Sequence, residues 1–97
     1  MRHELSRFIE GDLEAIAAVI SESNPRKTVA FIQQIRQHML LVAQQPQFHR
    51  PWPEVGPGAH LAQGCNCYIL FRIVGSRVRF ERIVWGGAEM PALFVNM

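Results

Sequence analysis

Long hydrophobic runs are absent from this sequence of 97 residues. No stretch approaches the roughly 20 apolar residues that a membrane-spanning helix requires. The charged first four residues (MRHE) also lack the apolar segment of a signal peptide. These absences argue against membrane attachment and export, so we expect a cytoplasmic protein with reduced thiols and no membrane contact.

A strong excess of one charge sign is also missing. Ten basic residues face eight acidic ones, which leaves a net charge of +2. So small an excess does not support tight binding to nucleic acid through phosphate contacts alone, and we expect proteins as partners. The hydrophobic share of 48% argues against a disordered chain. Because repeats, low-complexity tracts and linkers are absent, the sequence predicts a single domain over residues 1–97.

Cysteine is scarce, and the potential metal ligands lack a metal-binding pattern. Cys65 and Cys67 are the only cysteines, and they are too close in sequence for an unstrained disulfide. Their spacing is not that of a zinc knuckle, and no base adjoins Cys65 that would activate it as a nucleophile. The histidines are His3, His38, His49 and His60, and no two have His-x₃-His spacing. We expect no metal and no cofactor.

Two amphipathic helices are predicted in the N-terminal half. Ser6 is a candidate N-cap for a helix that runs to about Glu22, and Asn24-Pro25 starts a second helix that runs to about Gln44. The apolar residues at helical spacing are Ile9, Leu13, Ile16, Ala17 and Ile20, then Val29, Ile32, Ile35, Met39 and Val42, with Phe31 and Leu40 beside them. The short connection predicts an antiparallel helix hairpin.

A small antiparallel sheet is predicted in the C-terminal half. Prolines and glycines indicate an extended crossover over residues 46–58. Trp52 in this crossover is expected to cover the helix hairpin or, if exposed, to serve as a partner site. The sheet could start at residues 59–63, and strands follow at 67–74 and 77–85. Gly75-Ser76 between them is typical of a type II′ turn. Residues 2–5 are too short and polar to be predicted as a strand. The fold class is therefore α+β, a helix hairpin packed on the sheet.

The turn fixes the register of these strands and hence their two faces. Phe71 lies opposite Phe80 on an apolar face, and Arg72 lies opposite Arg79 on the other face. That second face also holds Tyr68, Arg77, Glu81 and Ile83. Directly opposed arginines repel each other, so this face is either a solvated surface or a docking surface for an acidic partner. Arg82 falls on the apolar face, which only a β-bulge would explain.

Several motifs occur in an order that resembles a known family. They are Asp12-Leu13-Glu14-Ala15-Ile16 at a helix start, the Asn24-Pro25 break, and Arg50-Pro51 and Gly56-Pro57-Gly58 in the crossover. Residues 66–73 (NCYILFRI) and 82–86 (RIVWG) are similar to the family's Asn-Tyr-x-Ile-x-Tyr-Arg-Val and Arg-Val-Leu-His-Gly strands. Over nearly its whole length, the chain resembles the RelE/ParE superfamily of bacterial type II toxin–antitoxin toxins, and its ParE branch in particular.

The resemblance implies a toxin of one of two kinds. RelE-type members cleave mRNA on the ribosome with basic residues and a tyrosine, whose positions fall here at Ala59, Leu61, Tyr68, Ala88 and Phe94. None of these supplies the cations that such a reaction needs. ParE-type members also lack that set and inhibit DNA gyrase by direct binding, so no catalytic residue is expected. An mRNA endonuclease stays as one alternative. A non-toxic, antitoxin-binding module is the other, because Trp85 and Ala88 replace a histidine and an arginine common in ParE-type sequences.

Two surfaces of the chain are expected to bind partners. The apolar C-terminal residues expected to contact gyrase are Trp85, Met90, Leu93 and Phe94, although Leu93 and Phe94 could instead fold back over the sheet. The resemblance also implies a cognate antitoxin with an acidic C-terminal segment, bound in a hetero-oligomer. It would lie on the outer face of the helix hairpin or on the arginine face, where Tyr68, Arg72, Arg77 and Arg79 are the expected contacts.

Overall fold

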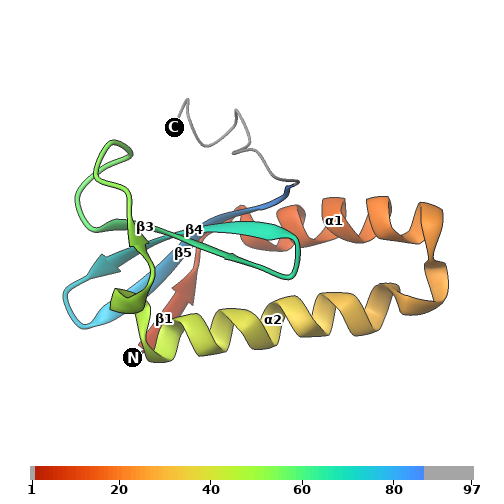
Figure 1. Cartoon of the computed structure of the whole chain (residues 1–97), viewed down its shortest axis with the longest axis horizontal. Coiled ribbons are helices and arrows are strands. Elements are labelled where there is room, and N and C mark those ends of the chain that lie inside the picture. Colours follow the sequence, from red (N-terminus) through yellow and green to blue (C-terminus); the bar gives the residue numbers. More distant parts are fainter. Residues whose placement is uncertain (1, 87–97) are drawn as a thin grey trace.

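The computed structural model describes residues 2–86, in which two antiparallel helices pack on one face of a five-stranded sheet (Figure 1). The helical elements are α1 (Ile9–Ser23), η1 (Pro25–Lys27), α2 (Thr28–Gln44) and η2 (Pro46–Phe48). The strands are β1 (Arg2–Leu5), β2 (Arg50–Pro51), β3 (Ala59–Gly64), β4 (Cys67–Val74) and β5 (Arg77–Trp85). The α+β helix hairpin predicted from the sequence is confirmed. Neither helix within residues 2–86 has both the length and the apolar character needed to cross a membrane.

The helices bury the stripes that their periodicity predicts, with exceptions at their edges. The buried residues are Ile9, Leu13, Ile16 and Ile20 in α1, and Ile35, Met39, Val42 and Ala43 in α2. Val29 and Leu40 were assigned to the apolar side of α2, but their side chains are 70% and 49% exposed. The second helix also begins later than predicted. Pro25 opens a 3₁₀ turn, and α2 starts at Thr28.

Ser6 does not occupy the N-cap position predicted for it. Helix α1 begins at Ile9 with Phe8 at the N-cap, and Ser6 lies in the preceding turn. Its hydroxyl accepts a hydrogen bond from the Phe8 N–H (3.2 Å) and donates one to the Glu81 carbonyl (2.6 Å). This serine therefore fixes the start of α1 against β5, a partner 75 residues away in sequence.

The sheet has the strand order β1-β5-β4-β3-β2, and it is mixed rather than purely antiparallel. Residues 2–5, which the sequence did not predict as a strand, form β1 and pair in parallel with Arg77–Phe80 of β5. The other pairings are antiparallel. The crossover also holds more regular structure than expected, since η2 and the two-residue strand β2 lie within it. Strand β1 lies at the edge of the sheet, where charged side chains such as those of Arg2 and Glu4 are common.

The β4–β5 hairpin has the predicted register up to one irregularity. Phe71 faces Phe80, Arg72 faces Arg79, and Gly75 has a φ of +61°, as the first position of a type II′ turn requires. The register then shifts between Leu70 and Phe71, which leaves Glu81 as the extra residue of a β-bulge. The bulge corrects the predicted faces. Ile83 is buried in the core under the helices rather than on the arginine face.

A second, smaller core covers part of the opposite face of the sheet, which we call the outer face. It consists of Ala59, Leu61, Tyr68 and Leu70, with Trp52, Val55 and Val84 partly buried against them. Trp52 was expected to cover the helix hairpin, but it packs here because the crossover returns on the outer side of β3. The outer face therefore has an apolar half and a charged half.

Candidate functional site

The charged half of the outer face is a ladder of arginines and glutamates from three strands. Arg79 bonds to Glu81 (Nε–Oε1 2.8 Å) and lies 3.5 Å from Glu4. Arg77 also approaches Glu4 (3.8 Å), and Arg72 approaches Glu81 (4.0 Å). The predicted contacts Arg72, Arg77 and Arg79 therefore lie together, but two carboxylates already partner them. The repulsion expected between the opposed arginines is reduced by these carboxylates.

The ladder retains an excess of positive charge. The parallel pairing of β1 with β5 places Arg2 beside Arg77 and Glu4 beside Arg79. His3, between them in sequence, contacts the Phe80 ring on the helix side, so Arg2 and Glu4 point to the outer face. Arg2 has no ion pair within residues 2–86. The sequence did not point to Arg2 or Glu4, because residues 2–5 were not predicted to join the sheet.

Tyr68, the fourth predicted antitoxin contact, lies on the outer face but belongs to its apolar half. Its side chain is only 4% exposed, so it presents little area to a partner in this arrangement. The backbone at Gly86 passes close to the Tyr68 ring, and a Cβ at that position would lie 2.3 Å from Tyr68 Cδ2. A glycine at position 86 is therefore required for the chain to leave β5 across this ring.

Arg72 is held by the crossover as well as by Glu81. Its guanidinium donates to the Pro57 carbonyl (3.4 Å), and a Cβ at Gly56 would lie 2.5 Å from Arg72 Nη1. Gly56 has a φ of +152°. The Gly-Pro-Gly segment thus gives the guanidinium space to lie against the backbone, which leaves Arg77 and Arg79 as the more accessible arginines of the predicted set.

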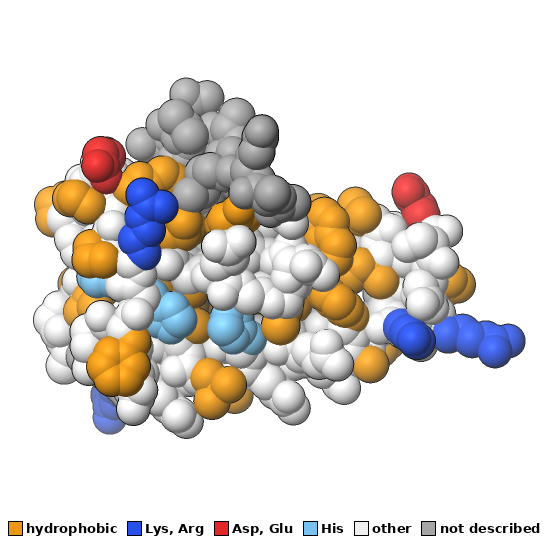
Figure 2. All heavy atoms as spheres, in the orientation of Figure 1, with side chains coloured by type: hydrophobic (Ala, Val, Ile, Leu, Met, Phe, Trp, Pro, Cys, Tyr) orange, Lys and Arg blue, Asp and Glu red, His pale blue; other side chains and the backbone are white. Residues whose placement is uncertain are grey.

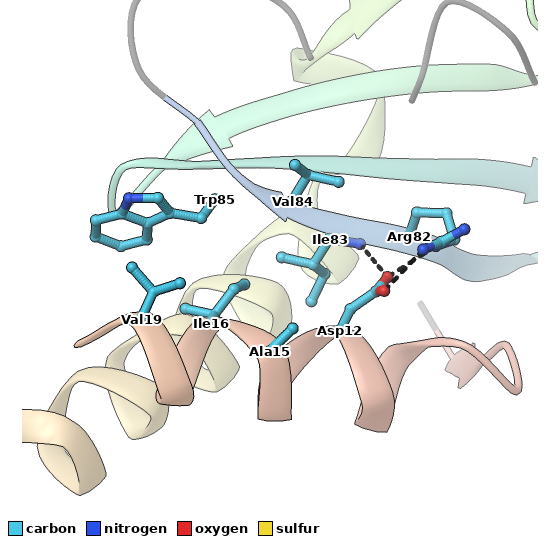
Figure 3. A pocket seen from close by; sticks show the side chains of 8 residues that line it. All are labelled: Asp12, Ala15, Ile16, Val19, Arg82, Ile83, Val84 and Trp85. Atoms are coloured by element: carbon cyan, nitrogen blue, oxygen red, sulfur yellow. Dashed lines mark hydrogen bonds and ion pairs between the residues drawn. The ribbon is translucent and has the colours of Figure 1, made fainter. Parts of the chain in front are cut away.

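The other notable surface is a groove between α1 and the last residues of β5 (Figure 3). Its cavity has a volume of about 300 Å³, and it is lined by Asp12, Ala15, Ile16, Val19, Arg82, Ile83, Val84 and Trp85. At one end the Asp12 carboxylate accepts hydrogen bonds from Arg82 Nε and Nη2 and from the Ile83 N–H, each of 2.9 Å. The bulge pairs Arg82 with Leu70 of the outer face rather than leaving it on the apolar face, and its guanidinium reaches α1, where Asp12 neutralises it. The hydrogen bond to Asp12 raises the pKa of Arg82 above its ordinary value.

Trp85, the first predicted gyrase contact, forms the other end of this groove. Its ring packs against Phe31 of α2, with centroids 5.4 Å apart, and its side chain remains 37% exposed. Met90, Leu93 and Phe94, the other predicted contacts, lie outside the described residues, as does Ala88. Of the positions that correspond to the ribonuclease residues, Ala59, Leu61 and Tyr68 are buried on the outer face.

Three histidines gather near the C-terminal end of α2. His60 stacks on the Phe71 ring (5.4 Å between centroids) and His49 meets it edge-on (5.9 Å). Figure 2 shows histidine side chains (pale blue) close together on this face of the molecule. Burial lowers the pKa of His38, and burial with the neighbouring His38 and His60 lowers that of His49. No group of three or more potential ligands within residues 2–86 is arranged to hold a metal ion.

The two thiols lie at the turn between β3 and β4, and neither forms a disulfide within residues 2–86. Cys65 and Asn66 form this turn with positive φ values of 52° and 58°, and Cys67 begins β4. Cys67 is buried and Cys65 is partly exposed. Burial, together with the neighbouring Cys65, raises the pKa of Cys67 to about 12, so its thiol is a poor nucleophile.

The described site thus consists of a basic ladder and an apolar groove on a helix hairpin and mixed sheet. No family model matches the chain, and no curated protein matches it. A solved structure described as a chromosomal ParDE TA system from P. aeruginosa contains a similar chain, with 21% identity and a TM-score of 0.74. The match covers 90% of this chain and 97% of that one. This likeness confirms the ParE-like toxin fold expected from the sequence motifs.

Proposed function

We propose that this protein is the toxin of a type II toxin–antitoxin module, neutralised by a cognate antitoxin. The observation that carries the proposal is the shared fold with a chain of a ParDE TA system over 90% of the length. The family motifs along the sequence support it independently. In this role the protein would arrest growth when free, and a plasmid that carried the module would be stabilised.

The antitoxin is proposed to bind the basic ladder through an acidic segment. Arg77 and Arg79 are the exposed contacts, Arg72 is a partly covered one, and Tyr68 borders them. An incoming carboxylate would compete with Glu4 and Glu81 for these arginines. Each new ion pair therefore contributes less to the binding free energy than it would with an arginine that has no partner. The ladder contributes mainly to association rate and orientation.

Charge reversal tests this assignment. We expect Arg79→Glu and Arg72→Glu to weaken binding to the protein encoded by the adjacent gene by about tenfold at low salt, with a smaller effect at high salt. Arg26→Glu is the matched control, because Arg26 is exposed on η1, away from the ladder. Thermal unfolding of each variant establishes that it is folded. Unchanged affinity for both ladder variants would refute the docking surface.

Inhibition of DNA gyrase by direct binding is the proposed toxic activity. It is supported by the absence of cationic residues at the ribonuclease positions, since Ala59 and Leu61 are apolar and buried. Trp85, Met90, Leu93 and Phe94 are the proposed contacts with gyrase, and no catalytic residue, cofactor or metal is assigned.

Controlled expression in a bacterial host distinguishes this activity from its alternatives. A DNA-damage reporter and protein synthesis are followed together after induction of the chain. A damage response with continuing translation is the expected result. An early halt of translation without damage would instead support the mRNA endonuclease, and unimpaired growth would support a non-toxic antitoxin-binding module.

A further inference from the structure

The outward edge of β5 is covered over only part of its length. Strand β1 pairs with Arg77–Phe80, and Ser6 extends this cover by donating its N–H to the Phe80 carbonyl (2.8 Å) and its hydroxyl to the Glu81 carbonyl. The Asp12 carboxylate then accepts the Ile83 N–H. Beyond that point the edge has no further cover from the described part of the chain.

The hydrogen-bond pattern between β4 and β5 shows which backbone groups project from this uncovered edge. Gly86 donates its N–H to Asn66 of the β3–β4 turn (3.0 Å), and Val84 lies opposite Tyr68. Hydrogen bonds alternate along an antiparallel pair, so Val84 bonds toward β4 while Ile83 and Trp85 direct their polar groups outward. The bond from Ile83 to Asp12 agrees with this alternation. Ile83 is only 1% exposed, so its carbonyl is covered. Trp85 is 37% exposed, and its N–H has no backbone partner within residues 2–86, so this end of the edge favours addition of a further strand.

The groove beside this edge offers an apolar site for a side chain. Ala15, Ile16 and Val19 of α1 form one wall, and Ile83 and Trp85 form the other (Figure 3). Its volume of about 300 Å³ lies at the lower limit for ligand pockets, so it suits one or two side chains rather than a larger ligand. The charges of Asp12 and Arg82 at the end of the groove neutralise each other, so the groove favours a neutral aliphatic occupant.

We propose that an extended, aliphatic segment of the antitoxin adds as a strand at Trp85 and places a side chain in this groove. The inference rests on the proposed function. The groove and short edge are too small for a stable interface between two copies of the chain, which favours a partner also held elsewhere. The basic ladder lies on the same strand, and Arg79 and Trp85 are separated by roughly 20 Å at the rise of a β-strand. One antitoxin chain can therefore reach both, with an acidic stretch at the ladder and an aliphatic stretch at the edge.

Filling the groove tests the side-chain contact. Ala15 lines the groove and is exposed, so Ala15→Trp fills it without disturbing the core. Ala18→Trp is the matched control, because Ala18 is also exposed on α1 but does not line the groove. We expect Ala15→Trp to weaken binding to the protein encoded by the adjacent gene by about tenfold or more. Ala18→Trp should bind like the wild type, and both variants should have wild-type thermal unfolding.

Amide exchange of the full-length wild-type chain tests the strand pairing. The Trp85 N–H should exchange at least about tenfold more slowly in the complex than in the free chain. The Ile83 N–H, already bonded to Asp12, should change less. Protection of Trp85 in the free chain would overturn the inference, since residues 87–97 would then occupy the edge, or a second copy would if the protection depended on concentration.

The remaining outcomes separate this inference from the function on which it rests. Binding of Ala15→Trp at wild-type affinity, or no protection of Trp85 in the complex, would overturn the strand addition while the antitoxin pairing stands. Failure of the wild-type chain to bind the adjacent gene's product at all would overturn both.

Discussion

Removal of the Asp12 carboxylate should cost much more stability than removal of another carboxylate two residues away on the same helix. Asp12 accepts three hydrogen bonds of 2.9 Å, two from the Arg82 guanidinium and one from the Ile83 N–H. The side chains of Asp12 and Arg82 are only 12% and 21% exposed. Asp12→Ala would leave a largely covered guanidinium and a backbone donor without partners. We therefore expect a loss of about 2–4 kcal/mol in the free energy of unfolding.

Glu10 provides the matched control. It forms a two-pronged bond with Arg36 at 3.1 and 2.8 Å, so the chemistry resembles that of the Asp12 pair. Its side chain is 61% exposed, however, and that of Arg36 is 45% exposed. Water screens such a pair, and Glu10→Ala should cost less than about 1 kcal/mol. The difference between the two variants isolates the effect of burial and of the backbone hydrogen bond.

Urea unfolding at neutral pH measures both losses, provided that the denaturant dependence of the free energy is unchanged. Asp12→Asn should lie between the wild type and Asp12→Ala, because the amide oxygen still accepts the Ile83 N–H but carries no charge. Equal losses for Asp12→Ala and Glu10→Ala would refute the reasoning. Asp12 would then act only as an exposed charge in the first turn of α1, and the β5 bulge would be held by the sheet alone.

Three further predictions follow from the interior around α2 and the β3–β4 turn. Gly64→Ala should lower the melting temperature, at a cost of about 1–3 kcal/mol, because its Cβ would lie 2.5 Å from His38 Nε2. Gly11→Ala, in open space on α1, should raise the melting temperature, with a gain of up to about 1 kcal/mol in the free energy of unfolding. A more stable Gly64→Ala than Gly11→Ala would contradict the packing around Gly64. Because the pKa of Cys67 is about 12, alkylation of the native protein at pH 8 should label Cys65 alone, as read by peptide mass. Rapid labelling of both thiols would contradict the burial of the Cys67 thiol. Burial lowers the folded-state pKa of His38, so the stability that neutral His38 supplies is present above the unfolded value of about 6.5 and is lost as pH falls toward the folded value. Urea unfolding between pH 7 and 5 should therefore show a steeper loss for the wild type than for His38→Gln, and parallel curves would contradict this assignment.

Local patterns in the sequence were sufficient for much of the architecture. Apolar spacing predicted the buried faces of both helices, since a helix repeats every 3.6 residues whatever it packs against. The Gly75-Ser76 turn predicted the pairing of Phe71 with Phe80, because a two-residue hairpin has one register. These features depend on residues close to one another along the chain. The motifs that resemble ParE-type toxins predicted the fold in the same way, and the structural likeness confirms it.

The features decided by tertiary structure all join residues distant in sequence. Strand β1 forms because Arg77–Phe80 offers it an edge, and Ser6 then anchors α1 to Glu81. The arginines of the outer face acquire Glu4 as a partner only through that pairing. The bulge that buries Ile83 and places Arg82 opposite Leu70 likewise depends on where α1 packs, since both residues bond to Asp12. Propensity and turn chemistry act between neighbours in the chain, whereas a short polar strand or an extra residue in a ladder is favoured only by contacts that exist after the helices and sheet have come together.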